Sequence, residues 1–166
     1  MRRSLIQTPI NLLSQASASI VPAIEVQALA HQAADPLQAE AAALLLASRI
    51  NAVVNPACVQ YRTDCQTLAN TLSQDRFIED PGYWSLRPLL HEFKPNTTGR
   101  GHEVTRINRR DNVYAHNLAR QAIRAQIPPN CNFMCRHLAH SDQCPVFQAF
   151  ALVNWGSFSP VNITCR

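Results

Sequence analysis

The chain has 166 residues, of which 46% are hydrophobic and 16% are charged, and its formal net charge is +4. This length is sufficient for a domain with its own core, and the apolar content excludes a chain that is disordered throughout. The charge is too small to indicate a dedicated nucleic-acid-binding protein, whose domains are usually far more basic. Twelve Asn and twelve Gln take the place of charged residues, which favours a surface that is buried against partner proteins.

The first 24 residues contain no acidic residue, and they combine Arg2 and Arg3 with several Ser and Gln. A basic, Ser-rich and acid-poor composition is typical of mitochondrial targeting segments. The alternative is an ordinary N-terminal arm. Polar residues and Pro9 interrupt the apolar stretch that a secretory signal would need. We therefore expect residues 1–34 to form an extended arm with a targeting-like composition, and we predict a mitochondrial location.

The first strong helix signal lies at Asp35 and Pro36, because Asp is a good N-cap and Pro is favoured at the first helical position. The Ala- and Leu-rich run that follows predicts a helix over Leu37–Val54, which ends at an Asn-Pro pair. Glu40 lies in its early turns, where an acidic side chain favours a helix. The run is short and carries Glu40 and Arg49, so we expect a core helix and no transmembrane segment.

Further helices are predicted from the apolar spacing and the proline positions that follow. They cover residues 58–72, residues 83–93, a basic stretch from 103 or 111 to 127, a short piece of the Cys/His segment, and residues 145–153. Residues 94–101 predict a loop. No segment shows a strict period of two, and the four glycines favour helices over a turn-rich β fold. The predicted fold class is all-α, with about five to six helices in one domain over residues 35–166, an extended N-terminal arm and an irregular C-terminal tail.

Six cysteines are candidates for disulfide bonds: Cys58, Cys65, Cys131, Cys135, Cys144 and Cys165. On a helix, Cys58 and Cys65 would share one stripe but lie about 10 Å apart, so each would need a partner from another segment, such as residues 131–144. Such cysteine pairs on helices resemble the helix–turn–helix proteins of the mitochondrial intermembrane space, although the spacing differs from theirs. Fifteen connectivities stay open. The alternative is a set of reduced, buried thiols.

The second cysteine group is interleaved with histidines and offers a possible zinc ligand set: Cys131, Cys135, His137, His140 and Cys144. Zinc prefers four such ligands in a tetrahedral arrangement. On one continuous helix, however, Cys131 and Cys135 would face one side while the other three face the opposite side. We therefore expect no metal and no cofactor.

A basic patch is predicted from six arginines: Arg100, Arg106, Arg109, Arg110, Arg120 and Arg124. Residues 94–166 carry a net charge of +6, whereas residues 1–93 carry −2. The patch suits either nucleic-acid phosphates or acidic side chains of protein, and we favour the second because Glu103 and Asp111 dilute it.

Searching the sequence for catalytic motifs finds no nucleophile elbow, phosphate-binding loop, zinc-protease helix or dinucleotide fingerprint. We therefore predict a protein that is not an enzyme. The expected function is that of a structural or accessory subunit of a large multi-protein assembly, in the first instance a mitochondrial inner-membrane complex, with other subunits as partners. Four aromatic residues are interpreted as packing residues or interface anchors and not as a ligand cage: Tyr83, Trp84, Trp155 and Phe158. The alternatives are a connector-type structural protein of a virion or phage, and a zinc-stabilised nucleic-acid-binding protein.

Overall fold

The computed structural model describes residues 4–10, 24–31, 33–55, 58–74, 76–99, 101–117, 132–136 and 143–165. The strands are β1 (Ser4–Ile10), β2 (Ile24–Ala30), β3 (Cys58–Thr63), β4 (Gly101–Arg106), β5 (Asn132–Cys135) and β6 (Phe158–Cys165). The helices are α1 (Pro36–Val54), α2 (Gln66–Leu72), α3 (Arg87–Thr97) and α5 (Pro145–Ala151), with short 3-10 turns η1 (Trp84–Leu86) and η2 (Arg109–Asn112). The fold is therefore mixed α/β, and the predicted all-α class is wrong.

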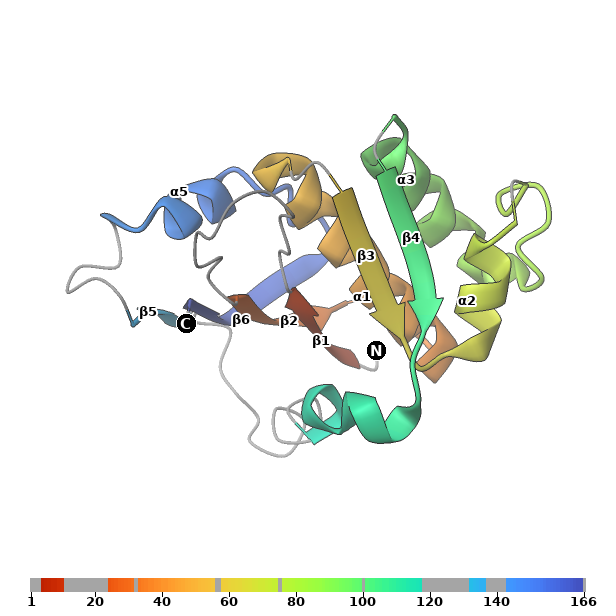
Figure 1. Ribbon diagram of the computed structural model, residues 1–166, viewed down its shortest axis with the longest axis horizontal. Coiled ribbons are helices and arrows are strands. Elements are labelled where there is room, and N and C mark those ends of the chain that lie inside the picture. Colours follow the sequence, from red (N-terminus) through yellow and green to blue (C-terminus); the bar gives the residue numbers. More distant parts are fainter. Residues whose placement is uncertain are drawn as a thin grey trace.

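The described strands form two sheets (Figure 1). The larger sheet has the order β1-β2-β6-β5, in which β2 is antiparallel to both of its neighbours and β5 runs parallel to β6. The smaller sheet is the parallel pair of β3 and β4. Each sheet thus contains one parallel pair, whose two carboxyl ends meet at one edge.

The predicted helix over Leu37–Val54 is confirmed by α1. The Asp35 carboxylate accepts a hydrogen bond of 2.8 Å from the backbone N–H of Gln38, which satisfies one of the open donors at the helix start. At the other end Asn55 has a φ of 54°, and this left-handed conformation terminates the helix. Both helix ends are therefore encoded by short-range signals.

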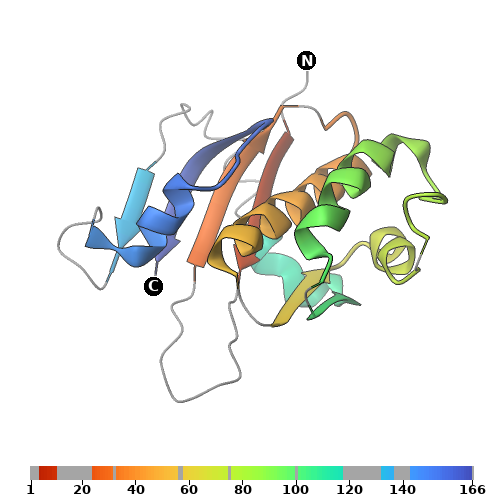
Figure 2. The same ribbon diagram turned by 90° about the horizontal axis from the view of Figure 1, so that it is seen from above.

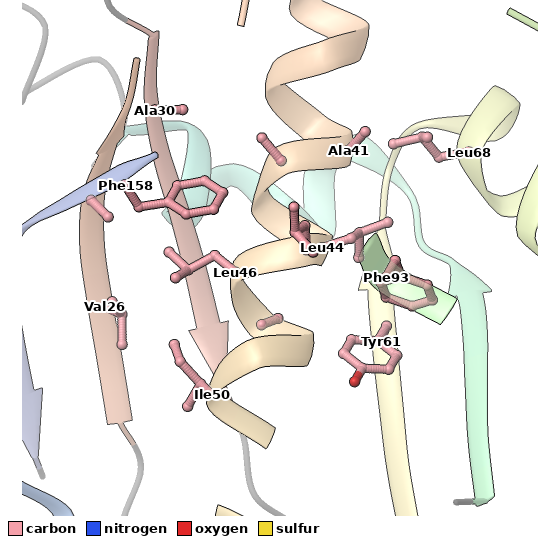
Figure 3. Close-up of a cluster of buried hydrophobic side chains, with 14 of the residues drawn as sticks. Val26, Ala30, Ala41, Leu44, Leu46, Ile50, Tyr61, Leu68, Phe93 and Phe158 are labelled. Carbon is pink, nitrogen blue, oxygen red and sulfur yellow. The ribbon is translucent and has the colours of Figure 1, made fainter. Parts of the chain in front are cut away.

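Apolar side chains cover α1 on more than one side, which is typical of a helix that is buried all round. Figure 3 shows Leu46 and Ile50 pointing toward Val26 of β2, whereas Leu44 points toward Tyr61 and Phe93 on the opposite side. One helix thus supplies the core for both sheets. It is also long and apolar enough to cross a membrane by length and composition, a weak criterion that buried core helices meet as well, and 50% of its most apolar window is buried.

The predicted helix over residues 58–72 is correct only in its second half, where α2 lies. The first half is β3, in which the side chains at alternate positions from Val59 to Thr63 are buried and those between them are exposed. This period of two is the pattern of a strand with one buried face. The turn between β3 and α2 places Asp64 at the end of a parallel strand, which a continuous helix would not do.

The expected arm and irregular tail also contain strands. β2 lies in the N-terminal segment and β6 in the C-terminal one, and the two are paired along their whole lengths. Pro160 has no N–H to donate, and it lies where the register shifts opposite Gln27 and Ala28. A bulge of this kind lets a central strand contain a proline. The larger sheet therefore joins the N-terminal and C-terminal parts of the chain.

Two further helix predictions hold. The predicted helix at 145–153 corresponds to α5, and the one at 83–93 corresponds to η1 and α3, which continues through Pro95 to Thr97. The predicted loop at 94–101 is shorter, because β4 begins at Gly101. For the basic stretch, the predicted helix start at 103 is wrong, because β4 lies there. The alternative start at 111 agrees with η2 and the helical residues 113–117, and residues 118–127 lie outside the described residues.

Candidate functional site

Polar side chains from three separate segments gather beside the carboxyl ends of β3 and β4. Asp64 directly follows β3, Asn112 and His116 lie on the segment that follows β4, and Glu40 lies near the start of α1. Figure 1 shows the arrowheads of β3 and β4 at the same edge, with the 113–117 turn below them. The carboxyl ends of parallel strands are the usual place for a ligand site in α/β proteins. We call these four residues the polar cluster.

Asp64 is the centre of the polar cluster. Its Oδ1 accepts a hydrogen bond of 2.8 Å from the Asn112 amide nitrogen, and its Oδ2 lies 2.9 Å from Nε2 of His116. An ionised carboxylate can only accept, so Nε2 carries the proton in this pair. Asn112 and His116 are four residues apart, which places both side chains on one face of the turn. The Asp64 side chain is 8% exposed and that of His116 is 25% exposed, so solvent reaches the imidazole more easily.

Two contacts hold the histidine-bearing turn against the rest of the fold. The backbone N–H of Ile107 donates to the carbonyl of Thr63 at 2.9 Å, which continues the ladder of the smaller sheet past the end of β4. The Tyr114 hydroxyl donates to the Glu25 carboxylate of β2 at 2.9 Å. His116 is therefore positioned by both sheets.

The pKa values of the two carboxyl groups in the polar cluster are shifted in opposite directions. Burial, and then the charge of Asp64, raise the pKa of Glu40, and the nearby positive charges of His116 and Arg109 only partly oppose this. Burial acts to raise the pKa of Asp64 as well, but the hydrogen bonds from His116 and Asn112 together outweigh it and lower that pKa. Neighbouring carboxyl groups with divergent pKa values are typical of sites that move protons or bind cations.

The predicted basic patch lies partly beside this cluster. Arg106, Arg109 and Arg110 are exposed on β4 and η2, and Arg106 is the register partner of Thr63, the residue before Asp64. Arg109 is close enough to influence the pKa of Glu40. The other three predicted members, Arg100, Arg120 and Arg124, lie outside the described residues. The described part of the patch thus borders a pair of carboxyl groups.

Sequence reasoning missed the polar cluster as a site. Glu40 was interpreted as a helix-start acid, and Asp64 was placed inside a helix. The signal that could have found Asp64 is the alternation of apolar Val59 and Tyr61 with polar residues, which predicts a strand that ends just before Asp64. His116 and Asn112 carry no local signal, because their partner is about 50 residues away in the sequence.

The disulfide prediction is wrong for the part of the chain that the structure describes. None of Cys65, Cys135, Cys144 and Cys165 forms a disulfide bond in the structure. Figures 1 and 2 place α2, next to Cys65, and β5, which ends at Cys135, at opposite ends of the molecule. The core around α1 separates them, so no cross-link can join these segments. The side chain of Cys58 and all of Cys131 lie outside the described residues.

Three of the cysteines nevertheless meet. The sulfur atoms of Cys135, Cys144 and Cys165 all lie within 4.8 Å of one another. Two of these, Cys135 and Cys144, belong to the predicted zinc ligand set, whereas its other members, Cys131, His137 and His140, lie outside the described residues. Burial, and then the neighbouring thiols of Cys144 and Cys135, raise the pKa of Cys165 to about 12.

Two hollows in the surface are lined neither by the polar cluster nor by the three neighbouring cysteines. One of about 370 Å³ is lined by residues that include Arg49, His91 and Glu92, near the end of α1. The other, of about 150 Å³, lies near the start of α1 and is lined by residues that include Gln38 and Ser85.

Comparison with known proteins identifies no family for this chain: no family model, curated protein or solved structure matches it.

Proposed function

We propose that the protein hydrolyses phosphodiester bonds of nucleic acid at the polar cluster, with a divalent cation such as Mg²⁺ bound by Glu40 and Asp64. The observation that carries this proposal is the convergence of two carboxyl groups with opposite pKa shifts beside a histidine and exposed arginines.

The carboxyl groups fit a hard cation. Mg²⁺ keeps several waters and usually needs only one or two protein carboxylates, with phosphate oxygens of the substrate completing its coordination. Asp64 is held ionised, and Glu40 is a carboxyl group whose negative charge is disfavoured as long as no cation balances it. A divalent ion between them would stabilise both charges, and it would supply Lewis acidity toward a phosphoryl oxygen.

His116 fits the role of proton carrier. Its Nε2 is tied to Asp64, which fixes the ring and leaves Nδ1 as the nitrogen for exchange with solvent or substrate. A carboxylate that orients an imidazole is a common arrangement for general acid–base catalysis. The partial exposure of His116 allows a water molecule or a leaving oxygen to reach it.

The arginines indicate a polyanionic substrate. Arg106, Arg109 and Arg110 are exposed along the segment between β4 and His116. Guanidinium groups bind phosphates in a bidentate manner, and such contacts position a strand without reading its sequence. The net charge of +6 on residues 94–166 would favour the approach of nucleic acid.

The test is hydrolysis of fluorogenic RNA, DNA and RNA–DNA hybrid in the presence of Mg²⁺ or of a chelator. We expect cation-dependent cleavage that Asp64→Asn, Glu40→Gln and His116→Ala each reduce by about a hundredfold or more. Glu79→Gln is the matched control, because Glu79 is an exposed acidic residue outside the cluster. Cleavage that persists unchanged in Asp64→Asn, or no cleavage of any of the three substrates together with no Mg²⁺ or Mn²⁺ binding by calorimetry, would overturn the proposal.

The second candidate is the predicted role as a non-catalytic subunit of a large assembly, for which the mitochondrial location stays a prediction. One observation favours it: Tyr83 and Trp84 are 54% and 69% exposed. Exposed aromatic pairs are typical anchors of protein interfaces. Loss of a co-purifying partner on Tyr83→Ala and Trp84→Ala, with an unchanged melting temperature, would support this role. Retention of the partner by the double variant would exclude this surface.

A further inference from the structure

We propose that Cys135, Cys144 and Cys165 form a binding site for Zn²⁺, which we call the cysteine corner. Cys135 and Cys165 are the last residues of the parallel strands β5 and β6, and they are direct register partners. Cys144 is the N-cap of α5. Three different elements thus bring one sulfur each to the same point.

The geometry is close to that of a zinc site. Two sulfurs that bind one zinc ion, each at about 2.3 Å, lie about 3.8 Å apart at the tetrahedral angle. The three sulfurs already lie within 4.8 Å of one another, so a contraction of at most about 1 Å would bring them to the ion. Among the described residues, this is the one set of three Cys, His, Asp or Glu side chains whose ligand atoms are that close. Three sulfurs leave the fourth tetrahedral position for a donor outside this set.

The chemistry of the corner selects a thiophilic ion. Thiolate ligands favour Zn²⁺ or Cu⁺ over hard cations, and a divalent ion better balances three negative sulfurs. Cys144 and Cys165 are 3% and 2% exposed, which leaves no surface for a substrate. On binding, Zn²⁺ replaces the thiol protons, which pass to solvent.

A metal at this point would hold the edge of the larger sheet. β5 has only four residues, and among the described strands it is paired with β6 alone. Its Phe133 packs on Phe147 of α5, with ring centroids 4.4 Å apart. One ion would link β5, β6 and the start of α5 directly. This role is independent of the proposed nuclease activity, since none of the cluster residues belongs to the corner.

The experiment uses the full chain, reduced and stripped of metal, and titrates it with Zn²⁺ against a chromophoric chelator. We expect one zinc per chain, and Co²⁺ in its place should give thiolate charge-transfer absorption with the intensity of three thiolate ligands. Cys135→Ser, Cys144→Ser and Cys165→Ser should each weaken zinc binding by at least about tenfold. Cys65→Ser is the matched control and should bind zinc as the parent does.

Three results would overturn the proposal. The first is a reduced, folded parent chain that binds no zinc. The second is unchanged zinc affinity in the variants of the corner. The third is a disulfide between two of the three cysteines in protein isolated without added oxidant. Because the Co²⁺ spectrum is measured on the parent chain, the outcome does not depend on whether the serine variants fold.

Discussion

The two parallel strand pairs of this protein have side chains of different chemical types at their carboxyl ends. β3 and β4 end beside oxygen and nitrogen donors, with exposed arginines around them. β5 and β6 end in two cysteines, and a third joins them from α5. The carboxyl end of a parallel pair brings together residues from distant parts of the chain in either case, and the residue types decide what kind of ion fits there.

The two regions also differ in how far their side chains are buried. At the polar cluster, a quarter of the His116 side chain is exposed, as a site that receives a substrate requires. At the cysteine corner, Cys144 and Cys165 are almost fully buried, as in closed structural metal sites. The proposed catalytic edge and the proposed zinc site thus differ in their access to solvent, although both lie on the core around α1.

The largest expected effect on stability is that of a substitution in the core around α1, which both regions share. Leu46 is fully buried in the core around α1, so Leu46→Ala should lower the free energy of unfolding by about 2–5 kcal/mol through the cavity it leaves. In urea unfolding, zinc binding and phosphodiester cleavage should be lost at the same lowered urea concentration. Loss at two distinct concentrations would mean that the two regions belong to separate folding units.

The next effect is confined to the polar cluster. Asp64→Asn should lower the free energy of unfolding by about 2 kcal/mol at neutral pH, because an amide cannot accept from both Asn112 and His116. The folded pKa of Asp64 lies below its ordinary value of 3.8, so this stabilisation is present above that value and is lost as the pH falls through the folded pKa. Chemical unfolding between pH 2 and 7 measures this stabilisation. A difference in the free energy of unfolding between parent and variant that is as large at pH 2 as at pH 7 would contradict the assignment.

Ionisation of Glu40 should have the opposite effect on the free energy of unfolding to that of Asp64. Its pKa is raised above the ordinary 4.5, so ionisation costs folded stability as the pH rises from 4.5 through the folded pKa. With chelator present, Glu40→Gln should therefore raise the free energy of unfolding by roughly 1 kcal/mol at pH 7 and leave it unchanged at pH 3. A more stable variant with less activity would mark Glu40 as a functional residue. A variant that is less stable at pH 7 would refute this account.

The smallest effect concerns the arginines. Arg110→Ala should change the free energy of unfolding by less than about 0.5 kcal/mol, since Arg110 is exposed. It should reduce the slope of log affinity for nucleic acid against log salt by about 0.9 if Arg110 contacts a phosphate. Fluorescence anisotropy at several salt concentrations measures the slope. Zinc content at the cysteine corner should not change.

Short-range signals in the sequence were sufficient for the helices with clear ends. Asp35 and Pro36 at one end and the Asn-Pro pair at the other define α1 without any tertiary information. The strands were missed where their partners are distant or their pattern is short. β3 shows its alternation only from Val59 to Thr63, and β6 contains Pro160, which argues against a central strand unless a bulge is present.

The two sites were harder to predict, because each is assembled across long separations. Cys135, Cys144 and Cys165 meet because β5 lies parallel to β6, which the cysteine spacing alone does not reveal. Helix geometry, applied to a segment that is partly strand, placed the possible zinc ligands on opposite faces. Asp64 was hidden for the same reason, since a helix over 58–72 would have made it one surface acid among several.

The pairing of β2 with β6 also has a consequence for synthesis of the chain. Nε2 of His31 lies 2.7 Å from Oγ of Ser159, although the two residues are 128 positions apart in the sequence. At roughly 5–20 residues per second, a ribosome needs on the order of 10 s to make that stretch. Throughout this interval α1, whose most apolar window has a mean hydropathy of 1.3, lacks the strand that completes its sheet. The nascent chain therefore exposes part of the apolar surface of α1 until β6 emerges.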